Sequence, residues 1–374
     1  MTPKGRDEGG KGPIFFLVFF CRYFENCDLI KSRRKPRSRR LTVCMAVACG
    51  QNCTFVVTQQ GALFAFGKGS TGQLGLASKD DQAEPTLVAS ATSLRSPVCM
   101  VAAGEKHAFC LTTAGTLFSW GSGILGQLGH GDYVSRQRPI PLGKQVCAGA
   151  KVQMVSCGQH HTMVLTDIGS VWTCGDGFKG KLGLGDITNH CTFAQVRWTG
   201  HYDLMPCMSM VTAGLHHSVA LASDGRVFSW GCALRGKLGL FHPSHPQYST
   251  EETRPMLVEN LEAHRVQMAA AGDDHTVVLT LEGIVLTWGA GDHGQLGLGG
   301  QDDTYVPEQI DADGLMDGAK ISVVACRNAR TALLTTNGVL YTCGRFISVA
   351  DTGLAAGDVV NDREQVHLTP HSCF

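Results

Sequence analysis

Four histidines recur in this chain at one place of a repeated phrase, each three residues after a Gly: His107, His161, His217 and His275. Histidine is a common general base and metal ligand near neutral pH. These four belong to successive copies of one unit, so a closed array would spread them around a circle rather than gather them. No second ligand follows at a fixed offset, and Cys53 and Arg330 fill the slot in the first and last copies. The pattern therefore favours buried histidines that hydrogen-bond a neighbouring unit, and it predicts neither a catalytic nor a metal site.

The two residues between that Gly and the histidine slot vary freely from copy to copy. They are Gln51–Asn52, Glu105–Lys106, Gln159–His160, Leu215–His216, Asp273–Asp274 and Asn328–Ala329. Varied polar residues in a loop that a rigid scaffold holds are typical of functional positions. For Asp273 and Asp274 the alternative is that both carboxylates only cap a turn.

The elements that must position these turns follow from the period of the chain. The glycines of the phrase, Gly50, Gly104, Gly158, Gly214 and Gly272, are 54 to 58 residues apart, and six copies are recognisable. In the third copy, alternating apolar residues predict strands over 152–156, 161–166, 170–174 and 193–196. Four antiparallel strands per copy and no helical period predict an all-β fold, a β-propeller with four-stranded blades.

The number of blades is left open between two arrangements. The six copies make a six-bladed ring, which we favour, or an incomplete seven-bladed one whose seventh blade would use residues 345–374 and 1–41. The last copy is degenerate, with Arg327 in place of the Gly, and terminal repeats are often atypical.

Composition divides the chain into residues 1–41 and a propeller over 42–374. The net charge is zero, but residues 1–41 hold eleven Lys and Arg against four Asp and Glu, so the remainder is acidic. An apolar run over 14–20 is too short to span a bilayer. A basic arm follows it: Lys31, Arg33, Arg34, Lys35, Arg37, Arg39 and Arg40. We expect residues 1–41 to be mostly disordered when free; the arm would contact nucleic acid or an import receptor, or be a plain solvated linker.

The sixteen cysteines fit neither a disulfide framework nor a zinc site, because no C-x-x-C pair occurs. Cys174 and Cys343 replace the Trp of other copies, and Cys49, Cys157 and Cys326 replace an Ala. We expect these cysteines to be buried core residues.

The phrases G-Q-L-G-L (72–76), G-Q-L-G-H-G-D (126–132), G-K-L-G-L-G-D (180–186), G-K-L-G-L (236–240) and G-Q-L-G-L-G (294–299) resemble the regulator of chromosome condensation (RCC1-like) repeat. The resemblance covers residues 42–374 and implies a β-propeller, usually of seven blades. The founding member is an exchange factor for the Ran GTPase, and acidic and histidine residues of its variable turn face the GTPase. By position, the resemblance implies a partner-binding role for Asp273, Asp274, His160 and His216, and a weaker one for Glu105 and Lys106.

A protruding wedge of the founding member also enters the GTPase. The largest decoration here, over 241–253, is short and broken by Pro, so we favour the interpretation that it is a plain loop.

We therefore expect a monomeric protein-interaction propeller of the cytoplasm, the nucleus or both, with a small GTPase or another protein on one face. Guanine-nucleotide exchange is the most that the resemblance implies as an activity. The alternatives are a scaffold without exchange activity and a chromatin-associated protein that uses the arm. The sequence carries no hydrolase, phosphate-loop or metalloprotease motif and predicts no cofactor, metal or membrane span. No Trp lies in the variable turns, which argues against the light sensing of the plant photoreceptor relatives.

Overall fold

The computed structural model describes residues 44–143, 146–198, 206–241, 250–311, 319–345 and 365–371. These residues form six antiparallel sheets of four strands, each a meander in chain order. The predicted all-β propeller is confirmed, and the structure has six blades. The proposed basic arm, residues 31–40, lies outside the described residues, and so does most of the decoration over 241–253.

The first three blades have these bounds: β1 Cys44–Cys49, β2 Cys53–Thr58, β3 Leu63–Gly67, β4 Gln82–Ala89; β5 Val98–Ala103, β6 His107–Thr112, β7 Leu117–Gly121, β8 Arg136–Pro141; β9 Val152–Cys157, β10 His161–Thr166, β11 Val171–Gly175, β12 His190–Gln195. The last three are β13 Met208–Ala213, β14 His217–Ala222, β15 Val227–Cys232, β16 Glu251–Leu257; β17 Val266–Ala271, β18 His275–Thr280, β19 Val285–Gly289, β20 Thr304–Gln309; β21 Ile321–Arg327, β22 Arg330–Thr335, β23 Leu340–Gly344, β24 Gln365–His371. Short 3₁₀ turns lie at Val146–Gly149, Phe178–Gly180, Leu234–Gly236 and Glu259–Leu261.

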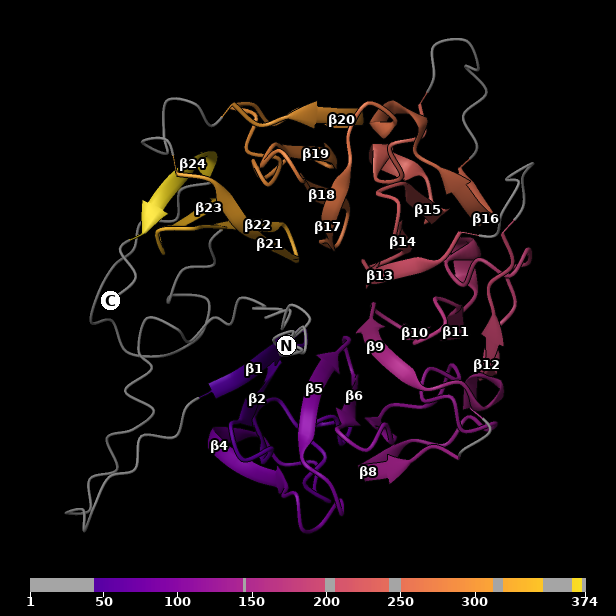
Figure 1. The fold of residues 1–374 in the computed structure, drawn as a ribbon. Coiled ribbons are helices and arrows are strands. Elements are labelled where there is room, and N and C mark those ends of the chain that lie inside the picture. The colour runs from indigo at the N-terminus through magenta and orange to yellow at the C-terminus, as the bar shows by residue number, and fades with distance from the viewer. Residues whose placement is uncertain are drawn as a thin grey trace, which may run out of the picture.

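The first strand of each blade lies toward the centre of the ring and the fourth at its periphery (Figure 1). First strands of successive blades pack on one another from β1 to β21. Blades one and six are set farther apart in Figure 1 than other neighbours. The sixth blade takes its fourth strand from Gln365–His371, so this part of the C-terminal segment belongs to the sixth blade and not to a seventh.

Glycine is required where the third strand meets the variable turn. At Gly121, φ is +97°, and a Cβ atom would lie 2.3 Å from the carbonyl oxygen of Lys106. The next amide, that of Ser122, donates to this same oxygen at 2.7 Å. Because the pattern recurs in each blade, the variable turn and the loop after the third strand lie side by side on one face of the ring. We call it the turn face.

Adjacent blades are joined by a buried hydrogen bond to the Gln or Lys of the G-[QK]-L-G phrase. Trp120 Nε1 donates to the carbonyl oxygen of Gln73 at 2.8 Å, and Trp230 Nε1 donates to that of Lys181 at 3.0 Å. The Cys174 thiol reaches the Gln127 carbonyl at 3.6 Å, so it replaces Trp in contact as well as in sequence. These side chains are fully buried, which confirms the predicted core roles of the Trp and Cys residues.

Candidate functional site

The recurring histidines are structural, as predicted. Their Nε2 atoms lie 2.9–3.1 Å from a hydroxyl of the next blade, in the pairs His107–Thr162, His161–Ser218, His217–Thr276 and His275–Thr331. Each hydroxyl donates its single proton to the carbonyl of the G-[QK]-L-G phrase, so it must accept from the histidine. The imidazoles are therefore neutral Nε2–H tautomers, and burial lowers the pKa of His107 and His217 to about 3 and that of His275 to about 4.

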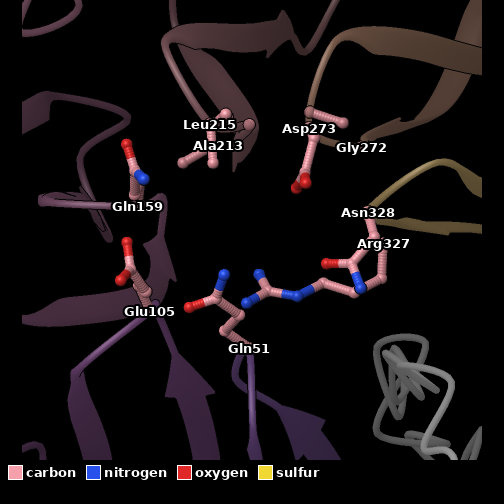
Figure 2. A pocket seen from close by; sticks show the side chains of 11 residues that line it. Gln51, Glu105, Gln159, Ala213, Leu215, Gly272, Asp273, Arg327 and Asn328 are labelled. Atoms are coloured by element: carbon pink, nitrogen blue, oxygen red, sulfur yellow. The ribbon is translucent and has the colours of Figure 1, made fainter. Parts of the chain in front are cut away.

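The first residues of the six variable turns meet at the ring axis. Gln51, Glu105, Gln159, Leu215, Asp273 and Asn328 line one cavity of about 30 Å³, together with Arg327. Backbone bonds hold successive turns together: Glu105 N–H donates to Gln159 O at 3.3 Å and Asp273 N–H to Asn328 O at 3.0 Å. Figure 2 shows Asp273 and Arg327 directed toward the same space. We call this cavity the axial cup.

Glu105, Lys106 and His160 form the first of two charged groups around the cup. Lys106 Nζ lies 3.0 Å from one oxygen of Glu105, and His160 Nε2 lies 3.5 Å from the other. Burial alone would raise the pKa of Glu105, but these two partners leave it below its usual value. The structure thus brings three of the six predicted residues into direct contact.

His216 and Asp274 belong to the second group. Asp274 pairs with Lys237 of the preceding blade, whose side chain is 4% exposed. Lys181, fully buried, pairs with Asp176 at 2.5 Å. His216 stands between the two lysines, and burial together with these charges lowers its pKa to about 4. The carboxylate of Asp274 therefore balances a buried cation, and it accepts no hydrogen bond from its own turn in the described part of the chain.

Asp273 differs from its neighbour. Within the described part of the chain no hydrogen bond or ion pair to its carboxylate occurs, and it faces the cup. Burial raises its pKa, Asp274 and Glu105 add to this, and Arg327 opposes it in part. The predicted pair Asp273–Asp274 thus divides into one cup residue and one ion-pair residue.

Sequence reasoning missed three kinds of residue on the turn face. The buried Lys181 and Lys237 stand where other copies have Gln, which was the available signal. Arg327 enters the cup, and the sequence shows it only as a departure from the Gly of other copies. One repeat position of blades two to four holds an exposed apolar side chain: Ile124, Phe178 and Leu234 are 66%, 53% and 50% exposed. The ring centroids of Phe178 and His216 are 6.3 Å apart. These apolar side chains therefore flank the charged groups.

The geometry of the described residues offers no metal site, because no group of three His, Cys, Asp or Glu side chains is placed to hold an ion. None of their helices is long and apolar enough to cross a membrane.

A model of the RCC1-like domain matches residues 24–326. The chain belongs to this family. Among curated relatives, the ultraviolet-B receptor UVR8 of Arabidopsis thaliana is 32% identical over 266 residues, 71% of this chain and 57% of its own length. The human E3 ubiquitin-protein ligase HERC2 is 32% identical over 347 residues, 88% of this chain and 7% of the ligase. This RCC1-like chain thus spans little more than half of one relative and a small part of the other.

Two solved structures share the propeller. Human WBSCR16 superposes with a TM-score of 0.76 at 25% identity, over 90% of this chain and 83% of its own. Prp20p of Saccharomyces cerevisiae superposes with a TM-score of 0.66 at 23% identity, over 76% and 67% of the two chains. The second likeness concerns the fold alone.

Proposed function

We propose that this RCC1-like propeller binds a small GTPase of the Ran type on its turn face and accelerates release of the bound nucleotide. The observation that carries the proposal is the composition of that face. Paired charges from blades two to five surround the axis, and three exposed apolar side chains lie beside them. A polar surface with a few apolar anchors is typical of a protein interface.

The size of the axial cup favours a protein over a small molecule as the occupant of this face. Ligand pockets usually enclose about 300–1,000 Å³, whereas the cup encloses about 30 Å³. A cofactor or nucleotide cannot enter such a space, but a single side-chain head group can.

The relatives supply the class of partner. Prp20p has binding properties toward Gsp1p and histones, and in another yeast structure Prp20 is bound to Kap60. Exchange requires a surface that is better matched to the nucleotide-free GTPase than to the loaded one.

The test measures release of fluorescent GDP from a loaded Ran-type GTPase, with and without this chain. We expect acceleration, and we expect Phe178→Ala/Leu234→Ala to weaken binding about tenfold or more because each truncated anchor costs about 1 kcal/mol. Ile168→Ala/Leu281→Ala is the matched control, since these side chains are 70% and 57% exposed in the turns between second and third strands, at the opposite face. Binding without faster release would identify a scaffold, the alternative function; no binding would overturn both for this GTPase.

Chromatin association through residues 31–40 stays a separate prediction, because these residues lie outside the described structure. A GTPase and a chromatin partner would both be consistent with the expected location in the nucleus, the cytoplasm or both.

A further inference from the structure

Arg327 occupies the one place in the chain where the repeat can accept a side chain instead of Gly. In the second blade, a Cβ atom on Gly104 would lie 2.3 Å from Cε1 of His107 and 2.5 Å from the carbonyl oxygen of Gly158 in the next blade. In the sixth blade, Arg330 replaces the histidine, and the first blade is not packed against it as other neighbours are. Both obstacles are therefore absent, and the side chain at this position can extend toward the axis (Figure 2).

Arg327 lines the axial cup and also a second cavity of about 20 Å³. Its Nε atom is buried and has no hydrogen-bond partner in the described residues. A buried guanidinium donor without an acceptor is costly, because it has lost water and gained nothing in return.

Asp273 faces the same cup from the neighbouring blade (Figure 2). The distance between its carboxylate and the Arg327 guanidinium exceeds that of an ion pair, since no pair within 4 Å joins them among the described residues. The other carboxylates of this region already have cations: Glu105 has Lys106 and Asp274 has Lys237. The Arg327 guanidinium and the Asp273 carboxylate thus face the same small space, and neither has an ion-pair partner among the described residues.

The charges and the volume select the class of ligand. Arg327 would attract an anion and Asp273 would repel it, whereas Asp273 would attract a cation and Arg327 would repel it. A charged ligand therefore gains little electrostatic binding energy in the cup. A neutral group that accepts on one side and donates on the other satisfies both. A water needs roughly 10–15 Å³ of such space, so about 30 Å³ suits a group of three heavy atoms.

We propose that the axial cup is a receptor for a primary carboxamide, the side chain of an Asn or Gln that the docked partner inserts at the ring axis. The carboxamide oxygen accepts from the Arg327 guanidinium, and its NH₂ group donates to the Asp273 carboxylate. The amides of Gln51, Gln159 and Asn328 line the remaining wall. The assignment of the ligand to a partner rests on the proposed function, but the chemistry of the cup does not.

The experiment titrates the protein, full chain, with acetamide, acetate or methylammonium and follows the Nε–H resonance of Arg327 by nitrogen-15 NMR. Loss of the signal in Arg327→Lys assigns it. We expect a saturable shift with acetamide at millimolar concentration, and at least tenfold weaker effects with the two ions. A stronger response to acetate or to methylammonium would overturn the proposal in favour of an ionic site, and no response to any probe would overturn it in favour of a cavity for water only.

Asp273→Asn provides the second arm. Removing the negative charge should weaken the acetamide response about tenfold and create a response to acetate, because only Arg327 then determines the preference. Arg138→Gln, an exposed arginine on β8, is the matched control and should change neither response. Since no GTPase is present in these titrations, their failure is distinguishable from failure of the proposed function. Unchanged ligand preference in a folded Asp273→Asn protein would refute the role of Asp273.

Discussion

The ion pair between Lys237 and Asp274 should be a stability determinant that can be removed and then restored by design. Lys237 belongs to the fourth blade and is almost fully buried, whereas Asp274 belongs to the fifth and its side chain is 32% exposed. Replacing Asp274 by Asn or Ala leaves the ammonium group buried without its counter-ion. We expect both substitutions to destabilise the protein.

The magnitude follows from the burial of the two partners. Breaking a fully buried pair costs about 3–5 kcal/mol because one charge is left uncompensated. Water reaches Asp274 and can partly solvate the lysine head group, so we expect a loss of about 2 kcal/mol for Asp274→Asn. For a domain of this size, that loss lowers Tm by about 3 °C.

Other copies of the repeat show how the lost stability can be restored. The slot of Lys237 holds Gln73, Gln127 and Gln295 in blades one, two and five. Each glutamine accepts from a backbone N–H of its own loop at 2.8–2.9 Å. Because its amide is neutral, a glutamine needs no counter-ion. Lys237→Gln added to Asp274→Asn should therefore recover stability to within about 0.5 kcal/mol, in line with the small cost of replacing both partners of a buried pair. The backbone carbonyl of residue 237, which accepts from Trp288, is retained.

Thermal unfolding of the wild type, the single variant and the double variant at pH 7 provides the test. An Asp274→Asn protein that unfolds at the wild-type temperature would refute the role of the ion pair. A double variant no more stable than the single one would refute it too, because the loss would then not come from the unpaired lysine.

Three further predictions concern other parts of the molecule. The four buried histidines have depressed pKa values in the folded state, so the unfolded state binds more protons between pH 6.5 and about 3. The stability that these histidines contribute is therefore complete above pH 6.5. It falls as the pH decreases, by up to about 5 kcal/mol per pH unit for the four together. Urea midpoints measured from pH 7 to 5 check this, and a flat profile would contradict it. His161→Cys/Ser218→Ala copies the Cys53 and Ala108 of the first two blades, and it should reduce that pH slope by about one proton. An unchanged slope in the folded variant would count against a neutral, buried His161. Deleting residues 31–40 should abolish any DNA binding and its steep dependence on salt, whereas binding that survives the deletion would locate it elsewhere.

Local patterns in the sequence were sufficient for the architecture of the blades, although they left the number of blades open. The period of 54 to 58 residues, the alternation within strands and the glycines at turns act over a few residues, so they predicted four-stranded blades and placed β10 at its observed bounds. The bounds of β11 and β12 differ from expectation by a few residues, because third and fourth strands pair across an irregular register. The repeated histidine was correctly assigned to the core. Residues at the same position of successive blades lie around a circle, so they cannot gather in one catalytic or metal-binding cluster.

The candidate site depends on contacts between blades, and no local pattern encodes these. Asp274 neutralises Lys237, whereas Asp273 has no ion-pair partner among the described residues. This difference follows from the offset between adjacent blades, which brings residues 37 positions apart into contact. Arg327 lies at the axis only because its own blade lacks the histidine and a closely packed successor. The sequence by itself determined the scaffold and the positions that vary. Only the tertiary structure decided which of those positions meet at the axis, because long-range electrostatics and packing are properties of the assembled ring.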